Sequence, residues 1–357
     1  MYIQEYTEEE KQKFNDAIVR KDYEVLFPWG INDLYDAGIN KNTIDTVFDI
    51  INAPEQIIPE FRKIVIDELI KGDIQGLQNA FTITKFLAES AQYISQQERV
   101  SLYSEASELS IKIWQKKGRF TKKLQIYNKD SQPVKVTAVS SEPRQTRTII
   151  ILHGLSGSKL SKEYIVDWFI KQGFMVLRFD IQGHGERWDP MRNNIIEDTR
   201  HIIEKIRDFD FVNQNELYIF GHSLGGFLTL AMISELNIFK GAIAIAGFLD
   251  REKGTNIKEL SLVQQRGIRF ITQSSSKIKN AYSSIPNYKI SEEAFTRSKT
   301  PLLIIHAIDD DVVPVKNVEI IKKLRPDAED MVLQSGGHVI GEQWKKVLER
   351  ISDFIKK

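Results

Sequence analysis

The segment with the clearest chemical potential is Glu216–Met232, ELYIFGHSLGGFLTLAM, which has Ser223 at its centre. A short apolar run precedes the serine and a helix-competent run follows it, which predicts a strand, a sharp turn and a helix. Glycines two residues before and two residues after Ser223 would let strand and helix approach without Cβ collisions. The pattern therefore predicts a serine nucleophile for acyl transfer, although G-x-S-x-G also occurs by chance.

Two backbone N–H groups are expected to stabilise the oxyanion that would form when Ser223 attacks an acyl group. One belongs to Leu224, directly after the serine, where the positive end of the helix also faces the substrate. The other belongs to Leu155, in the small-residue loop His153–Gly157 that follows an apolar run. An ordinary strand-to-helix turn is the alternative interpretation of this loop.

The expected general base is His338, at the end of the loop QSGGH. The paired glycines would give this loop the freedom to bring the imidazole over Ser223. Five of the six histidines follow apolar runs on turns, but only His338 lies between the last expected strand and the closing helix. A base is needed at that place in the chain order. The turn DIQGHGE is expected to fix loop geometry beside the site, so His184 is not the expected base.

The acid that orients the base should follow the apolar run PLLIIHA, where Asp309, Asp310 and Asp311 are consecutive. A carboxylate there would accept the imidazole N–H and hold the required tautomer. The residue spacing leaves the choice among the three open, and Asp250 is a more distant rival. A metal site is disfavoured because consecutive side chains diverge and no histidine cluster accompanies them, so no metal is expected.

Residues 1–118 are expected to form a helical domain, because helical patterns extend from Thr7 to about Gln115 with hardly any strand signal. Apolar residues recur at threes and fours within 73–91 and again within 97–114, which is typical of helices with one buried face. A membrane or partner surface could show the same pattern, but packing within the molecule is the simpler interpretation.

Residues 119–357 are expected to form a mostly parallel α/β domain. Alternating patterns at 122–127 and 133–140 predict two strands around a turn at 128–130. Continuous apolar runs predict parallel strands that are covered on both faces by crossover helices. These runs are TIIIL, FMVLRF, LYIF, AIAIA and PLLIIHA, followed by a last strand at 330–333, with helices at 162–171, 195–209, 317–324 and 342–355.

The polar segment 248–300 is expected to form a small cap. Its apolar members could line a substrate pocket or simply pack the cap down, and packing is the simpler interpretation; they are Leu262, Val263, Ile268, Phe270, Ile271 and Tyr282. The substrate-binding residues are unknown from sequence, with Glu186 and Phe248 as candidates. For Glu186 a structural role is the alternative.

Composition excludes several classes of function. The 49 basic and 49 acidic residues cancel, so no nucleic-acid or membrane-surface partner is expected. The absence of cysteine excludes disulfides, thiolate metal sites and a cysteine nucleophile. The acidic N-terminal sequence has no apolar leader and no stretch is long enough to span a bilayer, so we expect a cytoplasmic protein without a membrane span. A homodimer is possible.

From about Lys122 onward the chain resembles an α/β-hydrolase, through HGLSG, DIQGHGE, GHSLGG, HAIDDDVVP and GGH in family order. The family pattern HGxxDxxVP places the acid at Asp310, with Ala307 where glycine is usual. The helical part, with GDIQGLQNAFTITKFLAESAQ and QQERVSLYSEASELSIKIW, is similar to that of dihydroxypseudooxynicotine hydrolases, fungal pigment polyketide-shortening hydrolases and fermentation-respiration switch-type proteins. Members of that group cleave carbon-carbon bonds or esters.

The resemblance and the residues together imply a serine hydrolase with Ser223, His338 and Asp310 as its triad, which acts on a small-molecule ester or acyl substrate without a cofactor. Cleavage of a carbon-carbon bond beside a ketone, or of a thioester, is the alternative chemistry. A catalytically silent regulatory or binding protein is the alternative outside enzymes. The cap alone looks too small and polar to enclose an apolar substrate, so residues 7–115 are expected to act as a lid.

Overall fold

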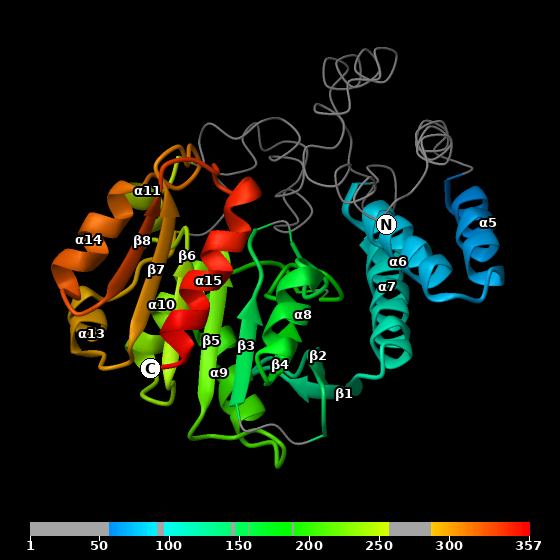
Figure 1. The fold of residues 1–357 in the computed structure, drawn as a ribbon, viewed down its shortest axis with the longest axis horizontal. Coiled ribbons are helices and arrows are strands. Elements are labelled where there is room, and N and C mark those ends of the chain that lie inside the picture. The colour runs from blue at the N-terminus through cyan, green and yellow to red at the C-terminus, as the bar shows by residue number, and fades with distance from the viewer. Residues whose placement is uncertain (1–56, 91–95, 144–146, 156, 188, 257–286) are drawn as a thin grey trace. The chain divides into compact units, whose positions relative to one another are not determined.

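The computed structural model describes residues 57–90, 96–143, 147–155, 157–187, 189–256 and 287–357. The chain divides into two compact units, of which one holds the described helices before Arg119 and the other holds the sheet (Figure 1). The helical patterns expected before residue 57, and the apolar members of the cap at 262–282, lie outside the described residues. Within the described parts of the chain, no helix has the length and apolar character needed to cross a membrane.

The helical unit contains α5 (Ile57–Ile70), α6 (Ile74–Ser90) and α7 (Gln96–Lys116). The predicted apolar faces of α6 and α7 are buried where the two helices pack together, and they include Ala80, Ile83, Phe86, Leu87, Leu102, Tyr103, Ala106, Leu109 and Ile113. At the start of α6, Asp73 accepts a hydrogen bond from the N–H of Gly76 at 2.6 Å. This bond satisfies one of the N–H groups that a helix start leaves unpaired.

The second unit is built on one eight-stranded sheet with the order β1-β2-β4-β3-β5-β6-β7-β8. Strand β2 pairs antiparallel with β1 on one side and with β4 on the other. The pairs that follow in the order β4-β3-β5-β6-β7-β8 are parallel. The strands are β1 (Phe120–Tyr127), β2 (Pro133–Ser140), β3 (Arg147–Leu152), β4 (Phe174–Phe179), β5 (Leu217–His222), β6 (Gly241–Ile245), β7 (Leu302–Ala307) and β8 (Glu329–Leu333). The mostly parallel α/β-hydrolase sheet expected from the sequence is confirmed.

Helices cover both faces of this sheet, which is why its inner strands are continuously apolar. Every residue of β4, β5, β6 and β7 is buried, whereas β8 alternates at the sheet edge. The long helices of the unit are α8 (Glu163–Lys171), α9 (Ile195–Arg207), α10 (Leu224–Glu235), α14 (Lys316–Leu324) and α15 (Trp344–Ile355). In Figure 1, α8 and α15 lie in front of the sheet. Tyr164 of α8 and Trp344 of α15 make an edge-to-face contact.

The strand order reverses beside β3, because the chain continues from β3 to β4 on one side and then to β5 on the other. Ligands of open α/β sheets bind outside the carboxyl ends of the strands at such a switch point. The loop after β3 and the turn after β5 both begin there, and these carry Leu155 and Ser223 respectively.

Several predicted element boundaries differ from the structure by one or two residues, and two of them have a clear structural cause or extent. The closing helix α15 begins at Trp344 rather than at Glu342, because a 3₁₀ turn, Gly341–Gln343, precedes it after Ile340 adopts a φ of 70°. Strand β1 begins at Phe120 and pairs with β2 along its whole length. Within the predicted cap at 248–300, the described parts include two short helices, α11 (Arg251–Gly254) and α13 (Glu292–Arg297).

Candidate active site

Ser223 lies on a tight turn between β5, which ends at His222, and α10, which begins at Leu224. Its φ of 57° and ψ of −116° form a backbone conformation that residues other than glycine rarely adopt. The N–H of Ser223 donates to the carbonyl oxygen of Ile245 at 2.9 Å, which ties the turn to β6. Strained backbone that the surroundings enforce in this way is characteristic of functional sites.

The glycines around Ser223 are required by close backbone contacts. A Cβ on Gly221 would lie 2.0 Å from the carbonyl oxygen of Gly225, and a Cβ on Gly225 would lie 2.2 Å from that of Leu152. A Cβ on Gly154 would lie 3.5 Å from the Cβ of Ser223. The loop after β3 therefore approaches the serine closely, as the two glycine motifs predict.

The substitution Gly225→Ala is expected to lower the free energy of unfolding by about 2 kcal/mol or more, because the new methyl group would overlap the backbone of β3. Urea titration followed by circular dichroism measures this loss. Gly118→Ala is the control, since nothing lies within 4 Å of its added Cβ and only strain at φ 71° opposes it, roughly 1 kcal/mol. Equal losses in the two variants would contradict the steric account.

The three residues predicted to form a triad are in hydrogen-bond contact. Nε2 of His338 lies 2.9 Å from Oγ of Ser223. Nδ1 of His338 lies 3.0 Å and 2.9 Å from the two carboxylate oxygens of Asp310. Because the carboxylate can only accept, Nδ1 carries the proton and Nε2 is left to accept the serine proton. This geometry matches what the predicted roles of nucleophile, base and orienting acid require, and the roles themselves stay a prediction.

Asp310 is held in its ionised form by its neighbours. The backbone N–H groups of Val312 and Val313 donate to Oδ1 at 3.0 Å and 2.8 Å. Burial opposes ionisation, but hydrogen bonds from His306, His338 and the Val313 N–H outweigh it and hold the pKa of Asp310 well below its usual range. The residue is 5% exposed, so its charge acts on His338 with little screening by water.

The other aspartates considered from the sequence contact different groups. Asp309 accepts hydrogen bonds from the N–H groups of two glycines in the loop before His338. Asp250 caps α11 by accepting from two N–H groups of its first turn. Asp311 is exposed, and its backbone carbonyl accepts from Asn256 at 2.9 Å. Of the four carboxylates, Asp310 is therefore the one that meets the histidine.

The N–H groups predicted to stabilise an oxyanion come from Leu155 and Leu224. Leu224 opens α10, where a helix offers its N–H no internal acceptor. Neither N–H donates a hydrogen bond to another residue in the described part of the chain. Both are thus available to an oxygen atom of a ligand, and their role in catalysis stays a prediction.

The loop that carries Leu155 is fastened to the loop after β4. The N–H of Ile181 donates to Nε2 of His153 at 3.0 Å, so the proton of this imidazole is on Nδ1 and faces the carbonyl oxygen of Gly154 at 2.9 Å. Burial lowers the pKa of His153 to about 4, so the ring is neutral. The N–H of Lys159 also donates to Asp180, at 2.7 Å.

His184 has a structural environment. Its Nδ1 lies 2.9 Å from the carbonyl oxygen of Gln182, and its ring is 4.9 Å from that of His153. Burial lowers the pKa of His184 to about 3, which keeps the ring neutral at physiological pH. These contacts hold His184 within its own turn and against His153, and the role of the turn DIQGHGE in fixing loop geometry stays a prediction.

The two candidate substrate contacts, Glu186 and Phe248, have protein partners. Glu186 pairs with Lys159, and it also accepts from Lys135 at 2.8 Å. Phe248 is buried and stacks on Phe227, with ring centroids 5.0 Å apart. Contact of either residue with substrate stays a prediction.

Sequence reasoning assigned no role to two histidines that flank the site. Nε2 of His222 lies 2.7 Å from the backbone carbonyl oxygen of His338. Nε2 of His306 lies 2.6 Å from the carbonyl oxygen of Val313, in the loop of the acid. Their positions, directly before Ser223 and four residues before Asp310, were the only sequence features that pointed to them. Their partners are backbone carbonyl oxygens, and contacts with backbone atoms of distant loops cannot be recognised from residue types.

The sheet order, the strained turn after β5 and the helical region before β1 define an α/β-hydrolase with an N-terminal helical region. A sequence model described as the prolyl oligopeptidase family matches residues 161–357, which is more than half of the chain. The protein therefore belongs to the prolyl oligopeptidase family of serine hydrolases.

Curated relatives match more than half of the chain. The uncharacterized protein YfhR of Salmonella typhimurium is 25% identical over 218 residues, which cover 57% of this chain and 68% of that protein. A thermostable monoacylglycerol lipase of a Bacillus species is 23% identical over 233 residues, which cover 58% of this chain and 90% of the lipase.

A solved structure of a 2,6-dihydroxy-pseudo-oxynicotine hydrolase aligns with a TM-score of 0.67 at 15% identity. The alignment covers 93% of both chains, so it extends beyond the hydrolase core into the helical region. Similarity at this level of identity is similarity of fold, and it confirms the resemblance inferred from the sequence.

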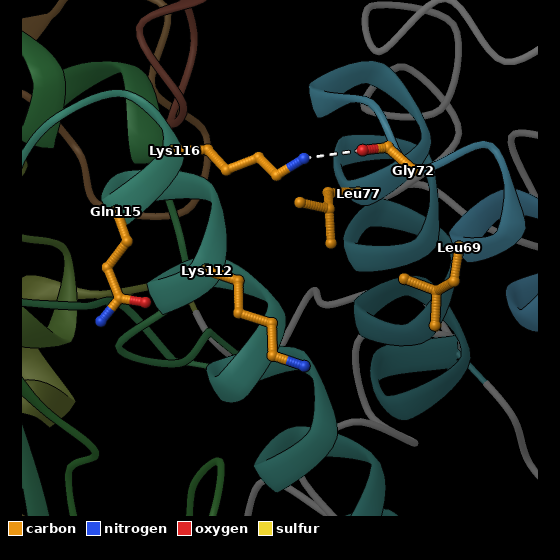
Figure 2. A pocket seen from close by; sticks show the side chains of 6 residues that line it. All are labelled: Leu69, Gly72, Leu77, Lys112, Gln115 and Lys116. Carbon is orange, nitrogen blue, oxygen red and sulfur yellow. Dashed lines mark hydrogen bonds between the residues drawn. The ribbon is translucent and has the colours of Figure 1, made fainter.

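The helical unit has a hollow of about 460 Å³ between α5, α6 and α7, which Figure 2 shows. Lys116 spans part of it and donates to the carbonyl oxygen of Gly72 at 2.7 Å. Its lining consists of Leu69, Gly72, Leu77, Lys112, Gln115 and Lys116. None of these six residues is a serine, cysteine or histidine.

Proposed function

We propose that this protein is a carboxylesterase-type hydrolase that cleaves small-molecule carboxylic esters through an acyl-enzyme on Ser223. The observation that carries the proposal is the continuous contact from Oγ of Ser223 through the imidazole of His338 to the carboxylate of Asp310. A serine hydroxyl is a weak nucleophile by itself, and a neighbouring base with a fixed tautomer activates it.

In the proposed reaction, Oγ of Ser223 attacks the ester carbonyl carbon while Nε2 of His338 takes the hydroxyl proton. Collapse of the tetrahedral intermediate breaks the carbon-oxygen bond of the ester, and His338 gives the proton to the departing alcohol. Water then attacks the acyl-enzyme as His338 accepts its proton. The carboxylic acid leaves, and the proton returns to Ser223. Asp310 stays ionised and stabilises the imidazolium in both halves of the cycle.

The N–H groups of Leu155 and Leu224 would donate to the oxyanion of each tetrahedral intermediate. Donors that are already oriented cost little reorganisation when charge develops, and removal of one such donor typically lowers kcat by about 10²- to 10³-fold. The close approach of Gly154 to Ser223 supports this role, because it brings the loop of Leu155 against the nucleophile.

There are two alternatives to an esterase. One is a different hydrolytic reaction carried out by the same three residues, and the other is a binding protein without catalytic activity. The name of the lipase relative favours an ester. Cleavage of a carbon-carbon bond beside a ketone, or of a thioester, is the second candidate, because the same nucleophile and base would serve either reaction. A silent binding protein is disfavoured by the intact contacts among Ser223, His338 and Asp310.

A panel of p-nitrophenyl esters, acyl thioesters and β-diketones tests the proposed chemistry on the full-length protein. We expect kcat/KM to be highest for an ester and to vary with its acyl chain. A higher kcat/KM for a diketone or thioester would replace the ester assignment with the second candidate. No turnover of any class, together with no labelling of Ser223 by a fluorophosphonate, would favour the silent protein.

We further propose that the helical region before residue 116 limits which substrates reach Ser223, because exclusion of water strengthens oxyanion stabilisation. The fragment Arg119–Lys357, which keeps all of β1, is expected to fold and to lose activity toward long-chain esters more than toward an acetate. Circular dichroism checks folding, and kcat/KM for both substrates checks selectivity. A folded fragment with unchanged selectivity would contradict the lid role and leave stabilisation or dimerisation as the alternatives.

A further inference from the structure

The loop that presents His338 has an unusual backbone. Gly336 and Gly337 have φ values of 137° and 58°, in the region that favours glycine. A Cβ on Gly336 would also lie 2.8 Å from the carbonyl oxygen of Ile340. Two such residues directly before the base make the loop easy to deform, so its position depends on contacts from outside.

Asp309 supplies such a contact on the N-terminal side of the base. Its carboxylate accepts hydrogen bonds from the N–H of Gly336 at 3.1 Å and from the N–H of Gly337 at 2.8 Å. The hydrogen bond from Gly337 is the main cause that lowers the pKa of Asp309, so the carboxylate is charged at neutral pH. Adjacent carboxylates thus contact different parts of one loop, because Asp310 meets the ring of His338.

His222 makes a contact on the other side. Burial lowers the pKa of His222 well below its usual range, so the ring is neutral and Nε2–H donates to the carbonyl oxygen of His338 at 2.7 Å. The main chain around the base is therefore held at the two preceding glycines and at the carbonyl group of His338 itself. Asp309 is exposed and does not belong to the turn that carries Ser223, whereas His222 directly precedes Ser223. Asp309 can therefore be substituted without changing that turn.

We propose that Asp309 is a positioning residue, whose carboxylate fixes the Gly336–Gly337 backbone and thereby places the imidazole of His338 against Ser223. This inference rests on the proposed function of the triad. Asp309 acts through the loop and does not touch the reacting atoms. Misplacement of a catalytic group by about 1 Å can cost about 10²-fold in rate, so the effect should appear in kcat.

The test compares Asp309→Asn and Asp309→Ala with Asp311→Asn in the full-length protein. Asparagine offers one acceptor oxygen and an NH₂ group that cannot accept, so one glycine N–H loses its partner. We expect kcat for p-nitrophenyl acetate to fall by about 10- to 100-fold in both Asp309 variants, with KM and the melting temperature close to wild type. Asp309→Glu should restore part of the rate, and Asp311→Asn should match wild type.

The rate of fluorophosphonate labelling gives a second readout, because it reports the reactivity of Ser223 without turnover of an ester. It should slow in the Asp309 variants and stay normal in Asp311→Asn. Wild-type kcat and labelling in Asp309→Asn would overturn the inference, as would a loss that merely follows a lower melting temperature. A wild-type protein that neither turns over esters nor reacts with the probe would instead overturn the proposed function.

Discussion

Ser223→Ala is expected to lower kcat for p-nitrophenyl acetate by about 10⁵-fold or more, because triad nucleophiles act as a unit with their base and their loss leaves only oxyanion binding. The alanine removes one oxygen atom on a turn whose backbone is fixed by the contact with Ile245, so the fold should be kept. Progress curves of p-nitrophenyl acetate hydrolysis give the rate, and circular dichroism checks that the variant is folded.

The melting temperature of Ser223→Ala should remain near or above that of wild type, since the left-handed turn stays occupied by a residue with a Cβ. Any residual rate is measured in two independent preparations of the variant. Equal rates would exclude a contaminating esterase, because the amount of a contaminant differs between preparations. If the folded variant keeps most of the wild-type activity, another residue is the nucleophile.

Asp310→Asn is expected to lower kcat by about 10⁴-fold, because the amide no longer holds the tautomer of His338 that leaves Nε2 free to accept a proton. The substitution also removes the negative charge that stabilises the imidazolium. Burial makes this charge effective, and its backbone donors at Val312 and Val313 keep the side chain in place. Steady-state kinetics over a range of pH measures the loss.

The matched control is Asp311→Asn, which changes an exposed carboxylate in the same loop. Its kcat should match that of wild type. Asp309→Asn should lose activity to a smaller extent than Asp310→Asn, since Asp309 contacts the loop backbone and Asp310 contacts the ring. A larger loss from Asp309→Asn would assign the acid to the preceding residue.

Much of the fold could be predicted because both faces of the central strands are covered, which makes β3 to β7 continuous apolar runs. The nucleophile turn was readable for a related reason. Gly221 and Gly225 have no room for a Cβ, so the close approach of strand and helix requires glycine at both positions and can be recognised in the sequence. Chain order then predicted His338 as the base, and the structure places its Nε2 2.9 Å from Oγ of Ser223.

The contacts around His338 and its loop could not be predicted from spacing. Asp309, Asp310 and Asp311 have identical side chains, and their partners depend on where a loop more than twenty residues later returns. The same holds for Glu186, whose neighbour Lys159 belongs to the loop after the preceding strand. The start of α15 was misplaced because the left-handed Ile340 introduces a 3₁₀ turn where helix propensity favours a regular helix.

The most direct test of the proposed mechanism is intact-protein and peptide mass spectrometry after brief mixing with a p-nitrophenyl ester and acid quench. We predict a mass increase equal to the acyl group, on the peptide that contains Ser223, and no increase in Ser223→Ala. Ester turnover by a protein that shows no acyl adduct, or an adduct that maps to another residue, would contradict an acyl-enzyme on Ser223.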